Sequence, residues 1–282
     1  MQTEAFFLTD PAPQGGQRFC LLHHSSLVPQ RGLVLYLHPF AEEMNKTRRM
    51  AALQARALAL AGFTVMQIDL WGCGDSSGDF GHATWKRWVG DVVLATAYLR
   101  QLEQEQMTTG SPGPLWLWGL RSGCLLAAEA AHRLDGPCNF LFWQAPASGK
   151  GQLQQFLRLK AAAGLVNDGA KGIVTQLRQQ LKTGLPVEIS GYELSSRLAS
   201  GLEQSALTPP ASEGLAPRVE WFELTMQVNS TLSPTSVKTI DYWRHAGYRC
   251  TSHIVNGLAF WQTSEIVEVE SLIDATTAAL CA

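Results

Sequence analysis

The residues Gly119-Leu120-Arg121-Ser122-Gly123 have the glycine spacing of a nucleophile elbow but carry an unusual residue at its centre. In the G-x-S-x-G pattern, the central serine sits on a sharp turn between a strand and a helix, and the turn exposes its hydroxyl for attack on a carbonyl. Here the central residue is Arg121, whose guanidinium stays protonated and cannot act as a nucleophile. The segment therefore indicates that the hydrolase activity was lost, that another residue is the nucleophile, or that the elbow now forms a ligand-binding pocket.

Strand and helix patterns alternate along the chain on both sides of this segment. Continuous apolar runs are typical of strands that are buried on both faces of a parallel sheet, whereas the first two strands flank a Pro/Gly turn and should pair antiparallel. Strands are expected at 6–8, 18–22, 32–37, 63–68, 115–118, 140–143, 219–224 and 248–255, and helices at 45–61, 84–106, 122–134, 234–246 and 263–280. This alternation predicts an α/β fold with a doubly wound, mostly parallel sheet.

Residues 147–210 interrupt the alternation. Three segments with helical composition, 152–163, 170–183 and 192–204, are separated here by Gly and Pro signals. We expect a helical cap at 147–210, inserted into a core formed by 1–146 and 211–282. Such a cap would lie over the carboxyl ends of the strands, where open α/β sheets bind ligands. The alternative is a set of packing helices remote from any site.

Three motifs in this order resemble the α/β-hydrolase superfamily. They are 35–40 (Leu-Tyr-Leu-His-Pro-Phe), 69–78 (Asp-Leu-Trp-Gly-Cys-Gly-Asp-Ser-Ser-Gly) and the elbow at 119–123. More narrowly, 38–50 and the Gly-Leu-Arg elbow resemble the exosortase A system-associated hydrolases of the type-2 group. That resemblance implies an α/β-hydrolase fold in a bacterial protein tied to exopolysaccharide production and to sorting of PEP-CTERM surface proteins.

A serine hydrolase of this fold needs an acid after a later strand and a histidine after the last strand. The expected histidine loop, 255–261, contains no histidine. The expected acid loop contains polar but uncharged residues, namely Gln227, Asn229, Ser230 and Thr231. Glu223 lies within the strand and Asp241 deep in the next helix. With Arg121 at the nucleophile position, none of the three triad positions holds a suitable residue. This pattern indicates that the complete catalytic triad is absent.

Ser122 is the candidate for a relocated nucleophile. A step of one residue turns a side chain by about 100° around the new helix, so we expect Ser122 to face inward and to bond the backbone or pack in the elbow. The thiol of Cys124 is explained by close helix packing. His253, inside the last predicted strand, is interpreted as a structural or surface residue.

The loop His38-Pro39-Phe40 corresponds to the segment that supplies one oxyanion-hole N–H in active relatives, the other coming from the residue after the nucleophile, here Ser122. Because Pro39 has no N–H, the donor would be Phe40 or a neighbour. His38 is either a proton donor or base, or a hydrogen-bonded anchor for the loop. An anion-binding geometry could thus persist without catalysis.

A charged edge follows this loop. Its residues are Glu42, Glu43, Asn45, Lys46, Arg48 and Arg49. If Asn45 caps the next helix, the cations occupy the first helical turn, where the macrodipole disfavours each by about 0.3–1 kcal/mol. A solvated face, ion pairs with Glu42 or Glu43, and recruitment of an anionic ligand or partner all remain open.

Arg121 needs a counter-charge, because a guanidinium is costly to remove from water. The loop after strand 32–37 borders the elbow in this fold, so we expect a bidentate pair between Arg121 and a carboxylate of Glu42, Glu43 or Asp75. Asp69 and Asp75 are otherwise interpreted as structural residues of a Gly-rich loop. Trp71 and Trp261, at strand ends, could form an aromatic wall for an acyl or sugar ligand.

Composition narrows the function classes. Lys and Arg (22) nearly balance Asp and Glu (24), which argues against nucleic acid and anionic membranes as partners. The six cysteines lack CxxC spacing and the histidines lack metal spacing, so we expect no metal, no cofactor and a reducing, cytoplasmic environment. No apolar stretch reaches the roughly 18 residues that a spanning helix needs. Direct membrane insertion is therefore not expected, and a homodimer stays open.

Two interpretations follow. In the first, the chain is a non-catalytic hydrolase-fold protein that binds a ligand, or a protein of the exopolysaccharide and sorting system, through the Arg121 pocket and the charged edge. In the second, it is an esterase, thioesterase or amidase that uses an unorthodox residue such as Ser122. The empty histidine position favours the first.

Overall fold

The computed structural model describes residues 2–106, 111–163, 170–212, 214–227 and 229–282. Its centre is an eight-stranded sheet in the order β1-β2-β4-β3-β5-β6-β9-β10. The strands are β1 (Thr3–Thr9), β2 (Gln17–His23), β3 (Gly32–Leu37), β4 (Phe63–Ile68), β5 (Leu115–Leu120), β6 (Asn139–Trp143), β9 (Arg218–Thr225) and β10 (Arg249–Asn256). Within this sheet, as the structure describes it, the pairs β1–β2 and β2–β4 are antiparallel and the others are parallel. The predicted antiparallel opening pair and mostly parallel sheet are both confirmed.

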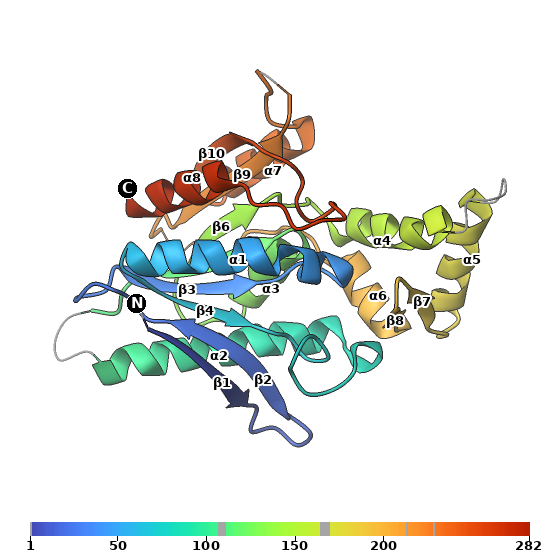
Figure 1. Cartoon of the computed structure of the whole chain (residues 1–282), viewed down its shortest axis with the longest axis horizontal. Helices are drawn as coiled ribbons and strands as arrows, with labels where there is room; N and C mark the ends of the chain where they lie inside the picture. The colour runs from blue at the N-terminus through green and yellow to red at the C-terminus, as the bar shows by residue number, and fades with distance from the viewer. Residues whose placement is uncertain (1, 107–110, 164–169, 213, 228) are drawn as a thin grey trace.

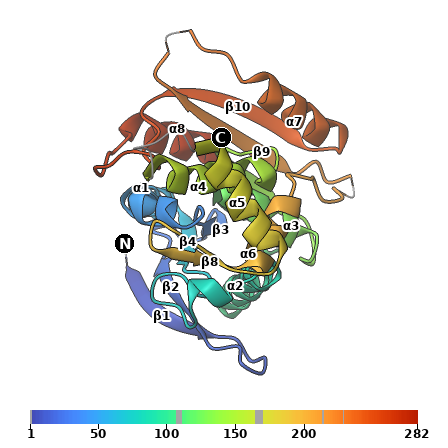
Figure 2. The ribbon, with the colours of Figure 1, turned by 90° about the vertical axis from the view of Figure 1, so that its right-hand side faces the viewer.

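Helices cover both faces of the sheet (Figures 1 and 2). The helices of the core are α1 (Glu42–Leu60), the short 3-10 helix η1 (Phe80–His82), α2 (Trp85–Gln106), α3 (Ser122–Ala131), α7 (Pro234–His245) and α8 (Glu270–Cys281). Buried side chains of α1 and α8 form one apolar cluster with one sheet face, and those of α2, α3 and α7 form a second cluster with the other face. The central strands β3 and β5 read as unbroken apolar runs because neither of their faces meets water.

Between β6 and β9 the chain forms an insertion that projects beyond the carboxyl ends of the central strands (Figure 1). It contains α4 (Gly149–Ala163), α5 (Ala170–Lys182), a hairpin of β7 (Val187–Ile189) and β8 (Tyr192–Leu194), and α6 (Ser196–Gln204). At its base the entering and leaving chains lie side by side, since the Leu207 N–H donates to the Ala147 oxygen at 3.1 Å. Helix α4 begins directly after this base and lies beyond the carboxyl ends of the central strands (Figure 1).

Three expected boundaries are wrong. Helix α1 begins at Glu42, so Asn45 lies inside it and is not its N-cap. Residues 192–194 form β8 instead of opening a helix, because they pair with β7. The last helix begins at Glu270, and the expected start at 263 falls in a loop whose Phe260 and Trp261 pack into the core. In each case tertiary contacts override the local composition.

Candidate functional site

The elbow keeps the backbone conformation that exposes its central residue. Arg121 has φ 56° and ψ −120° and is the N-cap residue of α3, directly after β5. A non-glycine residue at positive φ costs about 1–3 kcal/mol, which the surrounding structure must supply. A Cβ on Gly123 would lie 2.1 Å from the Leu37 oxygen, and one on Gly119 would lie 2.5 Å from Cys124 Cα. Both glycines are therefore required for the close approach of α3 to the sheet.

The Arg121 side chain lies buried between the core and α4, with 9% of its surface exposed. Its Nε and Nη2 both donate to Glu43 Oε1 at 3.4 Å, and Nη2 also donates to Gln155 Oε1 at 2.5 Å. With the Gln152 amide turned to match its neighbours, its oxygen accepts from Nη1 at 3.3 Å and Nη2 at 3.1 Å. The guanidinium carbon also lies 5.5 Å from the centre of the Trp261 ring. Arg121 thus links the elbow, α1, the insertion and the loop after β10.

The expected ion pair of Arg121 is present, and its partner is Glu43. The expected bidentate geometry is wrong, because both contacts go to one carboxylate oxygen. Asp75 is exposed and accepts no bond from Arg121, and its own N–H donates to Asp69 at 3.1 Å. Glu42 makes no contact with Arg121 among the described hydrogen bonds and ion pairs. The first turn of α1 places Glu43, and not its neighbour, toward the elbow.

Burial changes the protonation of the two acidic residues at the start of α1. Burial raises the pKa of Glu43 to about 7, although Arg121 acts in the opposite direction. Burial also raises the pKa of Glu42, against a smaller lowering by a backbone hydrogen bond and by Lys46. A carboxyl that titrates near neutral pH at the centre of a pocket is typical of a functional site. It also means that Arg121 is only partly neutralised at neutral pH.

A cavity of about 300 Å³ lies directly above this cluster. Three elements converge on it: the first turns of α1, one face of α4 and the loop after β10. Its lining residues are Phe40, Glu42, Glu43, Lys46, Gln152, Gln155, Phe156, Arg158, Leu159, Trp261 and Gln262. The size and the mixture of apolar walls with few polar groups suit a small-molecule ligand. We call it the Arg121 cavity.

Ser122 is not activated in this structure. It is 3% exposed, as expected for a side chain that faces inward. Among the described residues none forms a hydrogen bond with its hydroxyl, so no base is in place to remove its proton. The Cys124 thiol donates to the Gly119 oxygen at 3.1 Å, and burial raises its pKa far above the ordinary value. Neither side chain has the surroundings of a nucleophile.

His38 anchors its loop. Its Nδ1 lies 2.8 Å from the Pro39 oxygen, and its Nε2 accepts from the Leu70 N–H at 3.4 Å. These partners assign the neutral tautomer with the proton on Nδ1. Burial lowers the His38 pKa, which is consistent with a neutral ring. With both ring nitrogens engaged, His38 fits the anchor interpretation and not that of a proton donor or base.

His253 and Gln144, on or next to strands β10 and β6, are held by structural contacts. His253 lies within β10, where its Nε2 contacts Glu220 Oε2 at 2.8 Å and its ring stacks on Phe222 at 4.3 Å. The predicted structural interpretation of His253 is confirmed by these contacts. At the end of β6, Gln144 accepts from the Leu224 N–H at 2.9 Å. Among the described residues no histidine contacts Arg121 or Ser122.

The charged edge forms ion pairs, but not those expected. Arg48 pairs with Asp69 at 3.1 Å, and Arg49 pairs with Glu268 at 2.7 Å. Asn45 donates to the Tyr192 hydroxyl of β8 at 3.0 Å, which links α1 to the insertion. Because α1 begins earlier than expected, its first turn holds acidic residues, which the helix macrodipole favours. The expected conflict between cations and the dipole is therefore absent.

Asp69 holds the Gly-rich loop after β4. It accepts from Arg48 and from the Asp75 N–H, both at 3.1 Å, and a Cβ on Gly74 would collide with its carboxylate. This network matches the structural interpretation of Asp69. The guanidinium carbon of Arg87 lies 3.2 Å from the centre of the Trp71 ring. Of the two predicted aromatic wall residues, Trp261 lines the Arg121 cavity and Trp71 does not.

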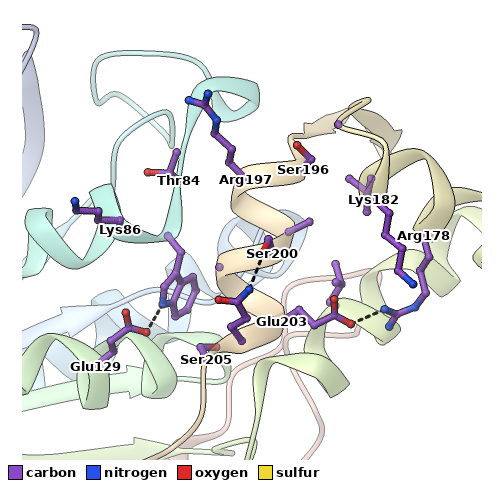
Figure 3. Close-up of a pocket in the computed structure, with 17 residues that line it drawn as sticks. Thr84, Lys86, Glu129, Arg178, Lys182, Ser196, Arg197, Ser200, Glu203 and Ser205 are labelled. Atoms are coloured by element: carbon purple, nitrogen blue, oxygen red, sulfur yellow. Dashed lines mark hydrogen bonds and ion pairs between the residues drawn. The ribbon is translucent and has the colours of Figure 1, made fainter.

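A second cavity, of about 910 Å³, lies between the insertion and the start of α2 (Figure 3). Two of its carboxylates are already engaged: Glu203 pairs with Arg178 at 2.6 Å, and Glu129 accepts from the Trp85 indole at 2.6 Å. None of its lining residues belongs to the elbow. We therefore place the candidate site at the smaller Arg121 cavity.

No group of three or more metal-binding side chains occurs in the part of the chain that the structure describes.

The fold and the elbow define the α/β-hydrolase class. The sequence pattern of the serine aminopeptidase S33 family matches residues 28–195, more than half of the chain, so the chain belongs to this family of hydrolases. No curated protein matches the sequence. None of the described helices is long and apolar enough to cross a membrane.

Solved structures with this fold include several esterases. Est1E from Butyrivibrio proteoclasticus with ferulic acid bound has a TM-score of 0.67 at 14% identity, covering 98% of both chains. A thermostable carboxyl esterase from Bacillus coagulans has a TM-score of 0.61 at 14% identity, covering 100% of this chain and 97% of that one. A serine hydrolase without a lid from Xanthomonas campestris has a TM-score of 0.56 at 15% identity, covering 99% and 94%. At these identities the likeness shows the fold alone.

Sequence reasoning missed the contribution of α4 to the site. Gln152 and Gln155 both contact Arg121, and neither residue type carries a chemical signal by itself. Their spacing of three residues places them on one face of a helix, which was the available clue. The expected cap placed this helix over the strand ends, but it did not indicate which face of the helix would meet Arg121.

Proposed function

We propose that this chain is a non-catalytic α/β-hydrolase-fold protein that binds a small ligand or a partner protein at the Arg121 cavity. The observation that carries the proposal is Arg121 itself. Its guanidinium occupies the space above the elbow where a nucleophile would act, and it is bonded there to Glu43, Gln152 and Gln155. A guanidinium in that place cannot itself form an acyl-enzyme, but it provides a charged group for recognition.

The same proposal assigns residues 147–210 as the cap and places the protein in a bacterial exosortase and exopolysaccharide system. Support for the cap comes from α4, which closes the cavity over the elbow. Support for the system comes from the resemblance of 38–50 and of the Gly-Leu-Arg elbow to the type-2 group. The cytoplasm remains the proposed compartment, because the six cysteines are all free. Co-purification from a bacterial host followed by mass spectrometry tests the partner assignment.

Catalysis is tested with a fluorophosphonate probe and a panel of p-nitrophenyl esters on the wild-type protein, Ser122→Ala and Arg121→Ser. We expect the probe to leave the wild-type protein unlabelled under conditions in which it labels an active serine esterase, the positive control. Arg121→Ser restores a hydroxyl at the elbow but no histidine, so we expect turnover to stay at background. Labelling of Ser122 with turnover abolished in Ser122→Ala would instead establish an active hydrolase.

A further inference from the structure

The ion pair at the floor of the Arg121 cavity is unusually long. Arg121 and Glu43 are separated by 3.4 Å, compared with 2.6 Å for Arg178 and Glu203 and 2.7 Å for Arg49 and Glu268. Charge-assisted bonds of this kind normally measure about 2.7–2.9 Å. The pair of Arg18 with Asp91 is buried even more deeply and measures 2.6 Å, so burial alone does not account for the long contact of Arg121 with Glu43. Glu43 is a weak partner that another carboxylate could replace.

The surroundings of Glu43 favour its neutral form. Its side chain is 13% exposed, and its second oxygen, Oε2, is buried without a partner among the described residues. The charged groups around it are Arg121 from the elbow, Glu42 and Lys46 from its own helix, and Arg158 across the cavity on α4. The cations act against the burial cost, but burial prevails and raises the pKa of Glu43 to about 7. A proton is therefore available to this carboxylate at neutral pH at little cost.

The walls of the cavity fit an amphipathic anion. Phe40, Phe156, Leu159 and Trp261 supply apolar surface from three elements. Two further cations, Lys46 and Arg158, line the same cavity, and neither forms an ion pair within the described part of the chain. Arg121 does not line the cavity itself, but it bonds to the lining residues Glu43, Gln152 and Gln155 and is a third cation directly behind them. This combination matches a carboxylate head with a short apolar tail.

We propose that the Arg121 cavity binds a small organic carboxylate with an acyl or aryl tail, whose carboxylate replaces that of Glu43 on Arg121 while Glu43 takes up a proton from solvent. This inference rests on the proposed binding function and specifies its ligand class. It requires no covalent step, because the proton comes from water and one anion replaces another beside the guanidinium.

The exchange has a definite dependence on pH. Below about pH 7 Glu43 is already protonated in the free protein, so affinity for the anion is constant there. Above that pH each bound ligand requires one proton, and affinity falls by up to tenfold for each further pH unit. The added carboxylates remain ionised throughout, so the loss of affinity belongs to the protein.

The test is isothermal titration calorimetry with 3-phenylpropanoate and octanoate, which separate aryl from acyl tails, and with the neutral 3-phenylpropanamide. Titrations between about pH 6 and 9 in phosphate and in Tris, whose ionisation enthalpies differ, report proton uptake. We expect at least one carboxylate to bind, with uptake approaching one proton above pH 7, and the amide to bind at least about tenfold more weakly. Absence of binding by both carboxylates at pH 6, or equal binding of the amide, would overturn the proposal.

Two variants and a control assign the groups. Arg121→Gln should weaken carboxylate binding about 10- to 100-fold, the value of one charge-assisted hydrogen bond. Glu43→Gln should bind at pH 8 as tightly as the wild type does at pH 6, with no proton uptake. Glu105→Gln, on the exposed face of α2, removes the same charge far from the cavity and should match the wild type. Unchanged proton uptake in Glu43→Gln refutes the exchange, even where Arg121→Gln fails to fold. The ester assay is a separate experiment. Hydrolysis there would refute the proposed non-catalytic function, whereas the calorimetry alone decides whether Glu43 takes up a proton on binding.

Discussion

Replacing Glu43 with glutamine should stabilise the protein at alkaline pH, although it deletes one member of an ion pair. The reason is that the desolvation of the buried carboxylate destabilises the folded state more than its 3.4 Å contact with Arg121 stabilises it. Glutamine has nearly the same shape, keeps an oxygen that can accept from Arg121, and carries no charge. The variant therefore separates the cost of burying charge from the cost of losing volume.

The magnitude follows from the pKa of Glu43. Burial raises it from 4.5 to about 7, and each pH unit corresponds to about 1.36 kcal/mol. Between these two pKa values the folded state binds more protons than the unfolded state, so wild-type stability falls as pH rises through this window. Above pH 7 the full penalty, about 3 kcal/mol, applies to the wild type and not to Glu43→Gln. Near pH 4.5 and below, the advantage of the variant should fall below about 1 kcal/mol.

The assay is urea unfolding of the wild type and of Glu43→Gln at about pH 4.5 and pH 8, followed by circular dichroism. Comparing the variant with the wild type at each pH cancels the contributions of all other titrating groups. Glu105→Gln is the matched control and should change stability by less than about 0.5 kcal/mol at both values. If Glu43→Gln is less stable than the wild type at pH 8, the pair with Arg121 is net favourable and the desolvation argument is wrong.

Two further predictions concern packing around the elbow. Gly123→Ala places a Cβ 2.1 Å from the Leu37 oxygen and should cost about 3 kcal/mol or more in urea unfolding, whereas Gly90→Ala, in α2 with nothing within 4 Å, should gain about 0.5–1 kcal/mol. Equal effects at the two positions would contradict the close approach. Under native conditions iodoacetamide should modify half-buried Cys281 well before Cys124, which is fully buried and whose pKa burial raises. Peptide mass spectrometry checks the order, and early labelling of Cys124 would refute its inert assignment.

Much of the architecture could be predicted from apolar periodicity. Strand β3 begins and ends where the sequence indicates, because a fully buried strand reads as an unbroken apolar run. The start of α1 was misplaced, since Asn45 is a good N-cap type and Ala41 is not. Ala41 nonetheless precedes the helix at φ 51°, a conformation imposed by the loop that packs beside the elbow. Local preference could not reveal that constraint.

The sequence by itself determined that the elbow carries a cation and that no histidine follows the last strand, because both statements depend only on residue identity in chain order. It also limited the counter-charge of Arg121 to a few carboxylates. Only the tertiary structure selected Glu43 and brought Gln152 and Gln155 onto the same guanidinium. It also buried the Glu43 carboxyl deeply enough to raise its pKa to about 7. The physical reason is that desolvation and long-range contacts depend on which surfaces meet, and segments 78 residues apart meet here only after the sheet has formed.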